Sequence, residues 1–167
     1  ETRAAWKVAM TTKDKPTVLV LSRQNLPVLP NTATTADEMV AKGGYVLSAQ
    51  QGDVPAGILI ATGSEVALAV EAQKALLAEG KDVSVVSIPS FDLFEQQSAS
   101  YKESVLPKAV TKRVGVEAAA SFGWERYIGD AGKMIAIDHF GASAPGGTIM
   151  KEFGFTAENV VNTFNSL

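Results

Sequence analysis

The chain has 167 residues, of which 46% are hydrophobic and 20% are charged, and its formal net charge is -3. This composition is typical of a globular protein, and the scattered basic residues and slight negative charge give no indication of a nucleic-acid or membrane partner. The absence of cysteine excludes disulfides and thiolate metal sites and favours a reducing compartment, so we expect a cytoplasmic location.

The first predicted elements are a helix at residues 1–10 and a strand at residues 17–22, TVLVLS. The segment 24–34 then carries Pro27 and Pro30 without hydrophobic periodicity, which is typical of an interdomain linker. One helix and one strand cannot bury a core of their own. We therefore expect residues 1–24 to be the last elements of a domain whose other elements lie outside these residues.

Three further helices follow from periodicity and end signals. Residues 35–38, TADE, have the spacing of a capping box and predict a short helix that ends at Gly43-Gly44. Residues 63–80 predict the longest helix, with a stop at Gly80. Its apolar stripe comprises Val66, Ala69, Val70, Leu76 and Leu77. A last helix is predicted to begin at Thr156.

Between the helices lie continuous apolar runs, which are typical of strands covered on both faces. They occupy residues 45–50, 57–62, 83–88, 113–118 and 134–140. Alternating strands and helices predict an α/β fold of three layers, α/β/α, with a mostly parallel sheet. The short connection at residues 51–56 predicts that the first two of these strands form an antiparallel hairpin, which puts one antiparallel strand at the edge.

A hydrolase site is a weak candidate. The stretch GASAPG around Ser143 resembles a nucleophile elbow, but Pro145 stands where that elbow requires its second glycine. The only histidine, His139, precedes the serine instead of following it, and Asp138 is its neighbour in sequence. A turn with a half-exposed histidine is the simpler interpretation.

A diphosphate-metal loop is a second weak candidate. Gly129-Asp130-Ala131-Gly132 resembles the Gly-Asp-Gly motif of thiamine-diphosphate enzymes, with Asn159 downstream as a further ligand. Here, however, an alanine follows the aspartate, and the stretch lies after a predicted helix and before a strand. These features favour a helix C-cap and turn over a metal site.

The junction Thr62-Gly63-Ser64 lies between a predicted strand and the longest helix. Free backbone N–H groups and the helix dipole favour an anion there, although every strand-to-helix junction shares this property. Glu117 and the aromatic residues Phe122 and Trp124 are interpreted as packing and helix-start features.

Several stretches resemble one family in order along the whole chain. They are LSRQNLP, AKGGYVL, IATGSEVALAVEAQKALLAEG, VSIPSFDLFEQQSASYKESVLP, VEAAASFGW, HFGASAP and KEFGFTAENVV. Together they are similar to the C-terminal part of bacterial transketolase. The resemblance implies that residues 1–24 end the pyrimidine-binding domain, that residues 25–44 form a linker and short helix, and that residues 45–167 form the C-terminal domain.

The resemblance also implies a substrate contact. In the family, the arginine of a Ser-Arg-Gln motif binds the terminal phosphate of the sugar substrate, and Ser22-Arg23-Gln24 matches this motif. An arginine offers a planar fork of donors that suits phosphate oxygens, and the predicted strand end is where open α/β sheets bind ligands. The alternative role for Arg23 is an ion pair at a domain interface.

The implied activity is transfer of a two-carbon ketol unit between phosphorylated sugars in the pentose phosphate pathway, by a homodimer with thiamine diphosphate and a divalent metal, Mg or Ca. We find no catalytic, cofactor-binding or metal-binding motif of the family in this chain. We therefore expect the chain alone to be inactive without the preceding N-terminal and pyrimidine domains. The alternative function is a separate anion-binding, dimerisation or regulatory module.

Overall fold

A computed structural model describes residues 1–30 and 32–167. Its centre is a five-stranded sheet in the order β1-β3-β2-β4-β5. The strands are β1 (Tyr45–Ser48), β2 (Ile58–Ala61), β3 (Ser84–Ser87), β4 (Arg113–Val116) and β5 (Lys133–Ile135). All neighbours are parallel except β1, which runs antiparallel to β3 at one edge. The predicted α/β fold, with a mostly parallel sheet and one antiparallel edge strand, is confirmed.

The predicted hairpin between residues 45–50 and 57–62 is wrong, because β1 pairs with β3 and not with β2. The burial of the strands explains the order in which they pair. All four residues of β2, β3 and β4 are buried, whereas β1 alternates between buried and less buried residues. A strand that is apolar on both faces needs neighbours and helices on both sides, so β2 lies at the centre and the half-covered β1 lies at the edge.

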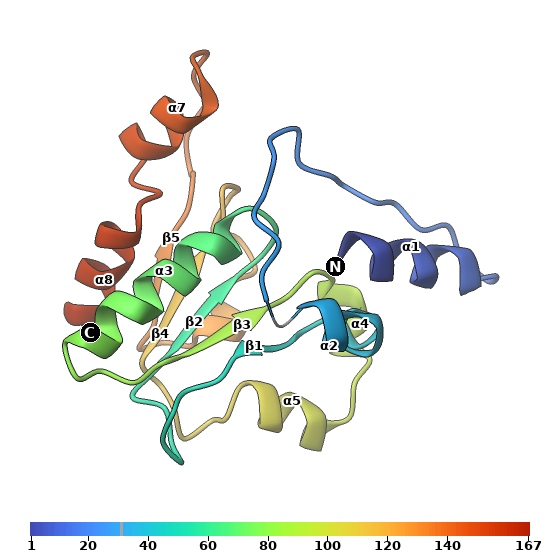
Figure 1. Ribbon diagram of the computed structural model, residues 1–167, viewed down its shortest axis with the longest axis horizontal. Helices are drawn as coiled ribbons and strands as arrows, with labels where there is room; N and C mark the ends of the chain where they lie inside the picture. Colours follow the sequence, from blue (N-terminus) through green and yellow to red (C-terminus); the bar gives the residue numbers. More distant parts are fainter. Residues whose placement is uncertain (31) are drawn as a thin grey trace.

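Helices cover both faces of the sheet (Figure 1). On one face α3 (Glu65–Ala78) and α8 (Ala157–Asn165) pack together against β2, β3 and β4. The other face carries α4 (Phe91–Glu95), α5 (Ala99–Val105) and α6 (Glu125–Ile128). Each face has its own hydrophobic core, so the architecture is the expected three layers.

The helix ends follow local chemistry. Gly80 has a φ of 78° directly after α3, and its N–H bonds the carbonyl of Leu77, which confirms the predicted stop. Thr156 caps α8, because its hydroxyl accepts a hydrogen bond from the backbone N–H of Asn159. Leu77, which the predicted apolar stripe includes, has an exposed side chain. Ala72 lies on the buried face instead.

The N-terminal helix α1 (Thr2–Thr11) confirms the predicted helix and packs on α2 (Thr32–Met39) and on the 3-10 turn η1 (Val40–Lys42). Ala4 of α1 is buried in the same core as Val40. Helix α2 begins three residues before the predicted start, because Thr32 already bonds the carbonyl of Leu29 through both its N–H and its hydroxyl. Asn31, which the predicted linker includes, lies outside the described residues.

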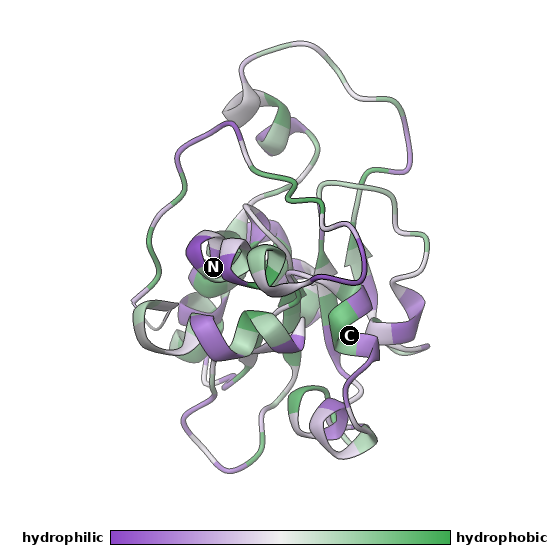
Figure 2. Ribbon diagram, turned by 90° about the vertical axis from the view of Figure 1, so that its right-hand side faces the viewer, coloured by the Kyte–Doolittle hydropathy of each residue, from purple (hydrophilic) through white to green (hydrophobic). Residues whose placement is uncertain are grey.

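The predicted strand at residues 17–22 is absent from the part of the chain that the structure describes. This segment is irregular, and side chains such as Val20, 92% exposed, face solvent. A strand needs a neighbour for its backbone N–H and C=O groups, and the five-stranded sheet leaves none beside this segment. Figure 2 shows hydrophobic stretches in loops that stand clear of the packed layers.

Helix α7 (Gly146–Glu152) projects above the sheet and has no fully buried residue (Figure 1). Within residues 1–30 and 32–167, no helix combines the length and the apolar character that crossing a membrane requires.

Candidate functional site at the carboxyl edge of the sheet

The carboxyl ends of three central strands meet at one edge of the sheet. Ala61 at the end of β2 is in register with Ser87 of β3 on one side and with Val116 of β4 on the other. The chain continues from β2 to β3 and later returns to β4 on the opposite side of β2, which makes β2 the topological switch point. In open α/β sheets this position is the usual ligand site.

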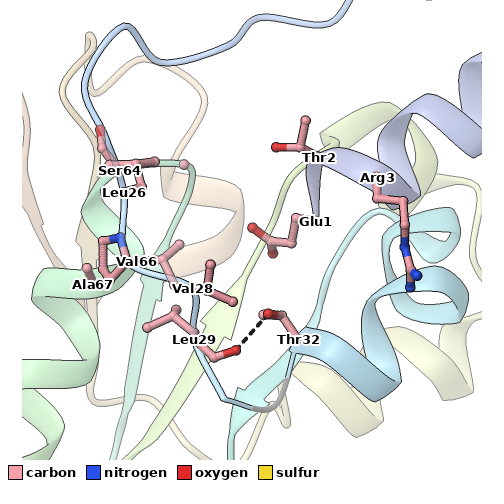
Figure 3. Close-up of a pocket in the computed structure, with 12 residues that line it drawn as sticks. Glu1, Thr2, Arg3, Leu26, Val28, Leu29, Thr32, Ser64, Val66 and Ala67 are labelled. Carbon is pink, nitrogen blue, oxygen red and sulfur yellow. Dashed lines mark hydrogen bonds between the residues drawn. The ribbon is translucent and has the colours of Figure 1, made fainter.

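A cleft of about 870 Å³ lies over this edge. Its floor comprises Thr62–Glu65, Pro89 and Glu117, and its wall is the segment Val18–Ser22 with Gln24–Leu26. A smaller cavity of about 310 Å³ adjoins it. Figure 3 shows Val28 and Leu29 of the linker facing Val66 of α3, with Glu1 and Thr2 on the other side. The predicted linker therefore covers the start of α3.

Arg23 lies beside the cleft, between Ser22 and Gln24, which both line it. Its side chain is exposed, and the structure assigns it no hydrogen bond or ion pair with any described residue. Residues 17–22 form no strand in this structure, so Arg23 follows an irregular segment, and its expected position at a strand end in the preceding domain stays a prediction. A free guanidinium at the rim of a cleft has all five N–H donors available for an incoming anion.

The floor of the cleft is acidic. Thr62 donates a hydrogen bond to the Glu117 carboxylate, and Ser64 donates one to Glu65. Glu65 is only 3% exposed. Burial raises the pKa of Glu117, the hydrogen bond from Thr62 opposes this, and the nearby charge of Glu65 raises the pKa further. The carboxyl group of Glu65 at the start of α3 and that of Glu117 after β4 therefore disfavour the anion that the Thr62–Ser64 junction by itself suggests.

A third carboxylate anchors helix α1 to the sheet. Glu1 Oε1 accepts hydrogen bonds from Tyr45 Oη and from Ser87 Oγ, both at 2.7 Å. The Arg3 guanidinium pairs with Asp37 at 2.9 Å on the exposed side of the same helix. These contacts place the start of α1 beside the cleft that the segment around Arg23 covers.

The candidate diphosphate-metal residues do not form a site. Gly129, with a φ of 71°, ends α6, and Asp130 is exposed in the turn that follows. The side-chain amide of Asn159 donates to the carbonyl of Gly154 at 2.9 Å, so it stabilises the start of α8. The turn interpretation is confirmed. No group of three His, Cys, Asp or Glu residues is placed to hold a metal ion within the described ranges.

The hydrolase candidate fails on geometry as well. The ring of His139 packs edge-on against Phe153, with the centroids 4.8 Å apart, and its Nδ1 lies 2.8 Å from the Phe140 carbonyl oxygen. Asp138 instead accepts a hydrogen bond from the Ser121 N–H at 2.9 Å, which lowers the pKa of Asp138. Neither residue is bonded to Ser143 in the described structure.

Two residues interpreted as packing features behave differently. Trp124 is buried against Phe91 and Tyr127, as expected. Phe122 is 93% exposed, so its interpretation as a packing residue is wrong.

Sequence reasoning also missed that Glu65 and Glu117 meet. Glu117 directly follows β4, and Glu65 begins the helix after β2, so the pairing of β2 with β4 brings them together.

Comparisons with known proteins agree with this geometry. Residues 43–156 match the family described as the transketolase-like TK C-terminal domain. The chain is 57% identical over its whole length to transketolase from Geobacillus stearothermophilus and covers 25% of that protein. A solved transketolase from Leishmania mexicana matches 99% of the chain with a TM-score of 0.90 and 42% identity, and the match covers 23% of the solved chain.

A transketolase from Pichia stipitis, solved in complex with sedoheptulose-7-phosphate, matches 99% of the chain with a TM-score of 0.87 and 40% identity. The match covers 24% of that solved chain. The present chain thus spans about a quarter of the length of the relatives it matches.

Proposed function

We infer the function from one premise, which is that the chain belongs to the transketolase family and contains its C-terminal domain. We propose that it is the C-terminal segment of a transketolase, an enzyme that transfers a two-carbon ketol unit between phosphorylated sugars in the pentose phosphate pathway. The chain spans about a quarter of each relative, and we propose that the other domains of the enzyme lie outside these residues, before the C-terminal domain.

The observation that carries this proposal for the chain's own residues is the position of Arg23. Its guanidinium is exposed at the rim of the cleft, in a Ser-Arg-Gln sequence, and has no partner among the described residues. We propose that it binds the terminal phosphate of the sugar through charge-assisted hydrogen bonds. A solved relative that binds sedoheptulose-7-phosphate supports a phosphorylated sugar as the ligand.

The acidic floor of the cleft suggests how the sugar is oriented. Glu65 and Glu117 repel a phosphate from the switch point, whereas Arg23 attracts it at the rim. The phosphate therefore binds beside Arg23 at the rim of the cleft, away from Glu65 and Glu117. In this arrangement Arg23 binds and orients the substrate and takes no part in proton transfer.

The domain organisation follows the same logic. We propose that residues 1–24 end the pyrimidine-binding domain, that 25–44 link it to the C-terminal domain, and that residues 45–167 are that domain. The apolar segment 17–22, unpaired and exposed here, supports a strand position in the sheet of the preceding domain. Helix α1, anchored by Glu1, then packs at the boundary of the two domains.

The family implies thiamine diphosphate and a divalent metal in the complete enzyme. The residues of this chain do not fit that group, because Asp130 lies in an exposed helix-ending turn and the amide of Asn159 is used at the start of α8. We propose that the preceding domains hold the cofactor and supply the catalytic residues, and that the complete enzyme is a cytoplasmic homodimer.

The alternative function is a separate module that binds an anion at Thr62–Ser64, or that serves dimerisation or regulation. The carboxyl groups of Glu65 and Glu117 at this junction count against the anion-binding form, because an ionised carboxylate repels an anion. Titration calorimetry of the chain with nucleotides and with sugar phosphates separates the two functions, because tight binding to the chain alone favours the module.

The test of the proposed function uses a full-length protein in which this chain is joined at Glu1 to the preceding part of the Geobacillus stearothermophilus relative. We expect ketol transfer from sedoheptulose-7-phosphate. Arg23→Ala should lower kcat/KM for that donor by roughly 10- to 150-fold, the worth of one charged hydrogen bond. A donor without phosphate should change little. Equal losses for both donors would assign Arg23 to the domain interface instead.

A further inference from the structure

Two aromatic side chains stand almost fully in solvent at the same edge of the sheet. Phe122, in the loop after β4, is 93% exposed, and Phe140, in the loop after β5, is 97% exposed. These loops follow the carboxyl ends of neighbouring parallel strands. Single exposed apolar residues are ordinary, but two phenylalanines on adjoining loops mark an interaction surface.

The two loops are tied together, so the phenylalanines are presented by one rigid support. The Ile137 N–H bonds the Ala119 carbonyl at 2.9 Å, and the Ser121 N–H bonds Asp138 Oδ1 at 2.9 Å. Phe122 directly follows Ser121, and Phe140 lies two residues after Asp138. Such a pair is positioned before any partner arrives, which reduces the entropy lost on binding.

Local packing turns both rings outward. The ring of His139 packs edge-on against Phe153, whereas the ring of the next residue, Phe140, stands in solvent. On the other loop, Trp124 is buried beneath β4 while Phe122 faces solvent. Each loop thus presents an exposed phenylalanine close to an aromatic residue that is packed against the fold.

The location identifies the partner. The segment around Arg23 covers the same carboxyl edge of the sheet, as part of the wall of the cleft over Thr62 and Glu117. Figure 1 shows residues 12–28 and α7 rising above this edge. If Arg23 binds the substrate phosphate, the rest of the active site must face this edge. The relatives are about four times longer than the chain, so they contain enough protein to cover it.

We propose that Phe122 and Phe140 are the anchors of an interface with the part of the enzyme that precedes Glu1, and that this interface holds the preceding domain over Arg23. The inference rests on the proposed function for its choice of partner. The complementary surface is apolar, since neither ring offers a hydrogen bond.

The experiment compares the double variant Phe122→Ser/Phe140→Ser in the 167-residue chain and in the full-length protein defined above. Because both rings are exposed in the chain, its Tm should change by less than about 1 °C. In the full-length protein the Tm should fall by roughly 3–8 °C, because two buried rings are lost. Val54→Ser is the matched control. Val54 is 72% exposed in the loop before the amino end of β2, so its substitution should not change the Tm of either protein.

Three outcomes would overturn the proposal. Equal Tm losses in the two proteins would mean that the rings stabilise their own loops, and unchanged Tm values in both would mean that they contact nothing. If the double substitution halves the mass of the 167-residue chain in light scattering, the partner is a second copy of this chain. If the double variant does not fold, Phe122→Leu/Phe140→Leu should show a smaller loss in the full-length protein alone. The readout is independent of activity, so it can fail or succeed separately from the Arg23 test.

Discussion

The hydroxyl of Thr62, at the end of β2, donates a hydrogen bond to the carboxylate of Glu117, at the end of β4. The two residues are far apart in sequence, and the parallel pairing of their strands brings them to the same edge. The bond favours the charged carboxylate, but burial and Glu65 favour the neutral form and prevail, so the pKa of Glu117 is raised.

The raised pKa predicts a pH dependence of stability. The folded state holds the Glu117 proton more tightly than the unfolded state, for which the ordinary value is 4.5. The resulting stabilisation is present below the unfolded pKa and is lost as the pH rises through the higher folded pKa. Glu117→Gln keeps an acceptor for Thr62 and removes the charge. Urea unfolding of the 167-residue chain from about pH 4 to about pH 8 should show a variant that becomes more stable than the wild type as the pH rises. A constant difference across this range would contradict the assignment.

A second prediction concerns Arg113, which is buried although it carries a charge. Its guanidinium donates to the carbonyls of Val110, Tyr127, Leu106 and Pro107, at 2.6–3.2 Å. Arg113→Met leaves these buried carbonyls unpaired and should reduce the free energy of unfolding by about 2–4 kcal/mol. Arg113→Lys should restore part of the loss.

The matched control for Arg113 is Arg126→Met. Arg126 is largely exposed and lies 3.6 Å from Glu95, so its loss should cost at most about 1 kcal/mol. Urea unfolding measures all three variants. Equal effects at the two positions would show that the carbonyl contacts of Arg113 contribute nothing to stability.

A third prediction concerns the segment between α1 and α2. Residues 12–30 contain no helix or strand, and nearly all of their side chains are at least partly exposed. Limited trypsin digestion of the chain should therefore cut first after Lys13 and Arg23. Lys74 lies within α3 and should be cut much later. Mass spectrometry identifies the fragments, and early cleavage within α3 would show that the core is less stable than its packing indicates.

A fourth prediction separates charge from geometry at Arg23. In the full-length protein, Arg23→Lys keeps the positive charge but loses the planar fork that binds two phosphate oxygens at once. It should recover part of the kcat/KM that Arg23→Ala loses with sedoheptulose-7-phosphate. Because the phosphate is remote from the reacting carbon, the loss should fall mainly on KM, unless this contact also orients the sugar for reaction.

The outcome for Arg23→Lys has two informative limits. Full recovery would mean that charge alone attracts the phosphate, and no recovery would mean that the bidentate contact is essential. Steady-state kinetics with the phosphorylated and the unphosphorylated donor give both parameters for each variant. A loss that is equal for the two donors would remove the phosphate from the explanation.

Much of the local structure is determined by the sequence itself. The helix at 65–78, its end at Gly80 and the cap at Thr156 follow from periodicity and from the chemistry of neighbouring residues. The buried strands follow from continuous apolar runs. The Ser-Arg-Gln sequence at 22–24 likewise points to Arg23 as the candidate phosphate contact. Each of these features depends on residues that are close in sequence, so each can be predicted from a short segment of the chain.

Only the tertiary structure decided which strands are neighbours. A short connection favoured pairing of β1 with β2, but burial of both faces of β2 required β3 and β4 beside it. That order brings Thr62 to Glu117, places the segment around Arg23 over their cleft, and leaves Phe122 and Phe140 in solvent. The strand at 17–22 failed to form for the same reason, because a strand depends on a partner for its backbone hydrogen bonds, and the sheet here offers it none.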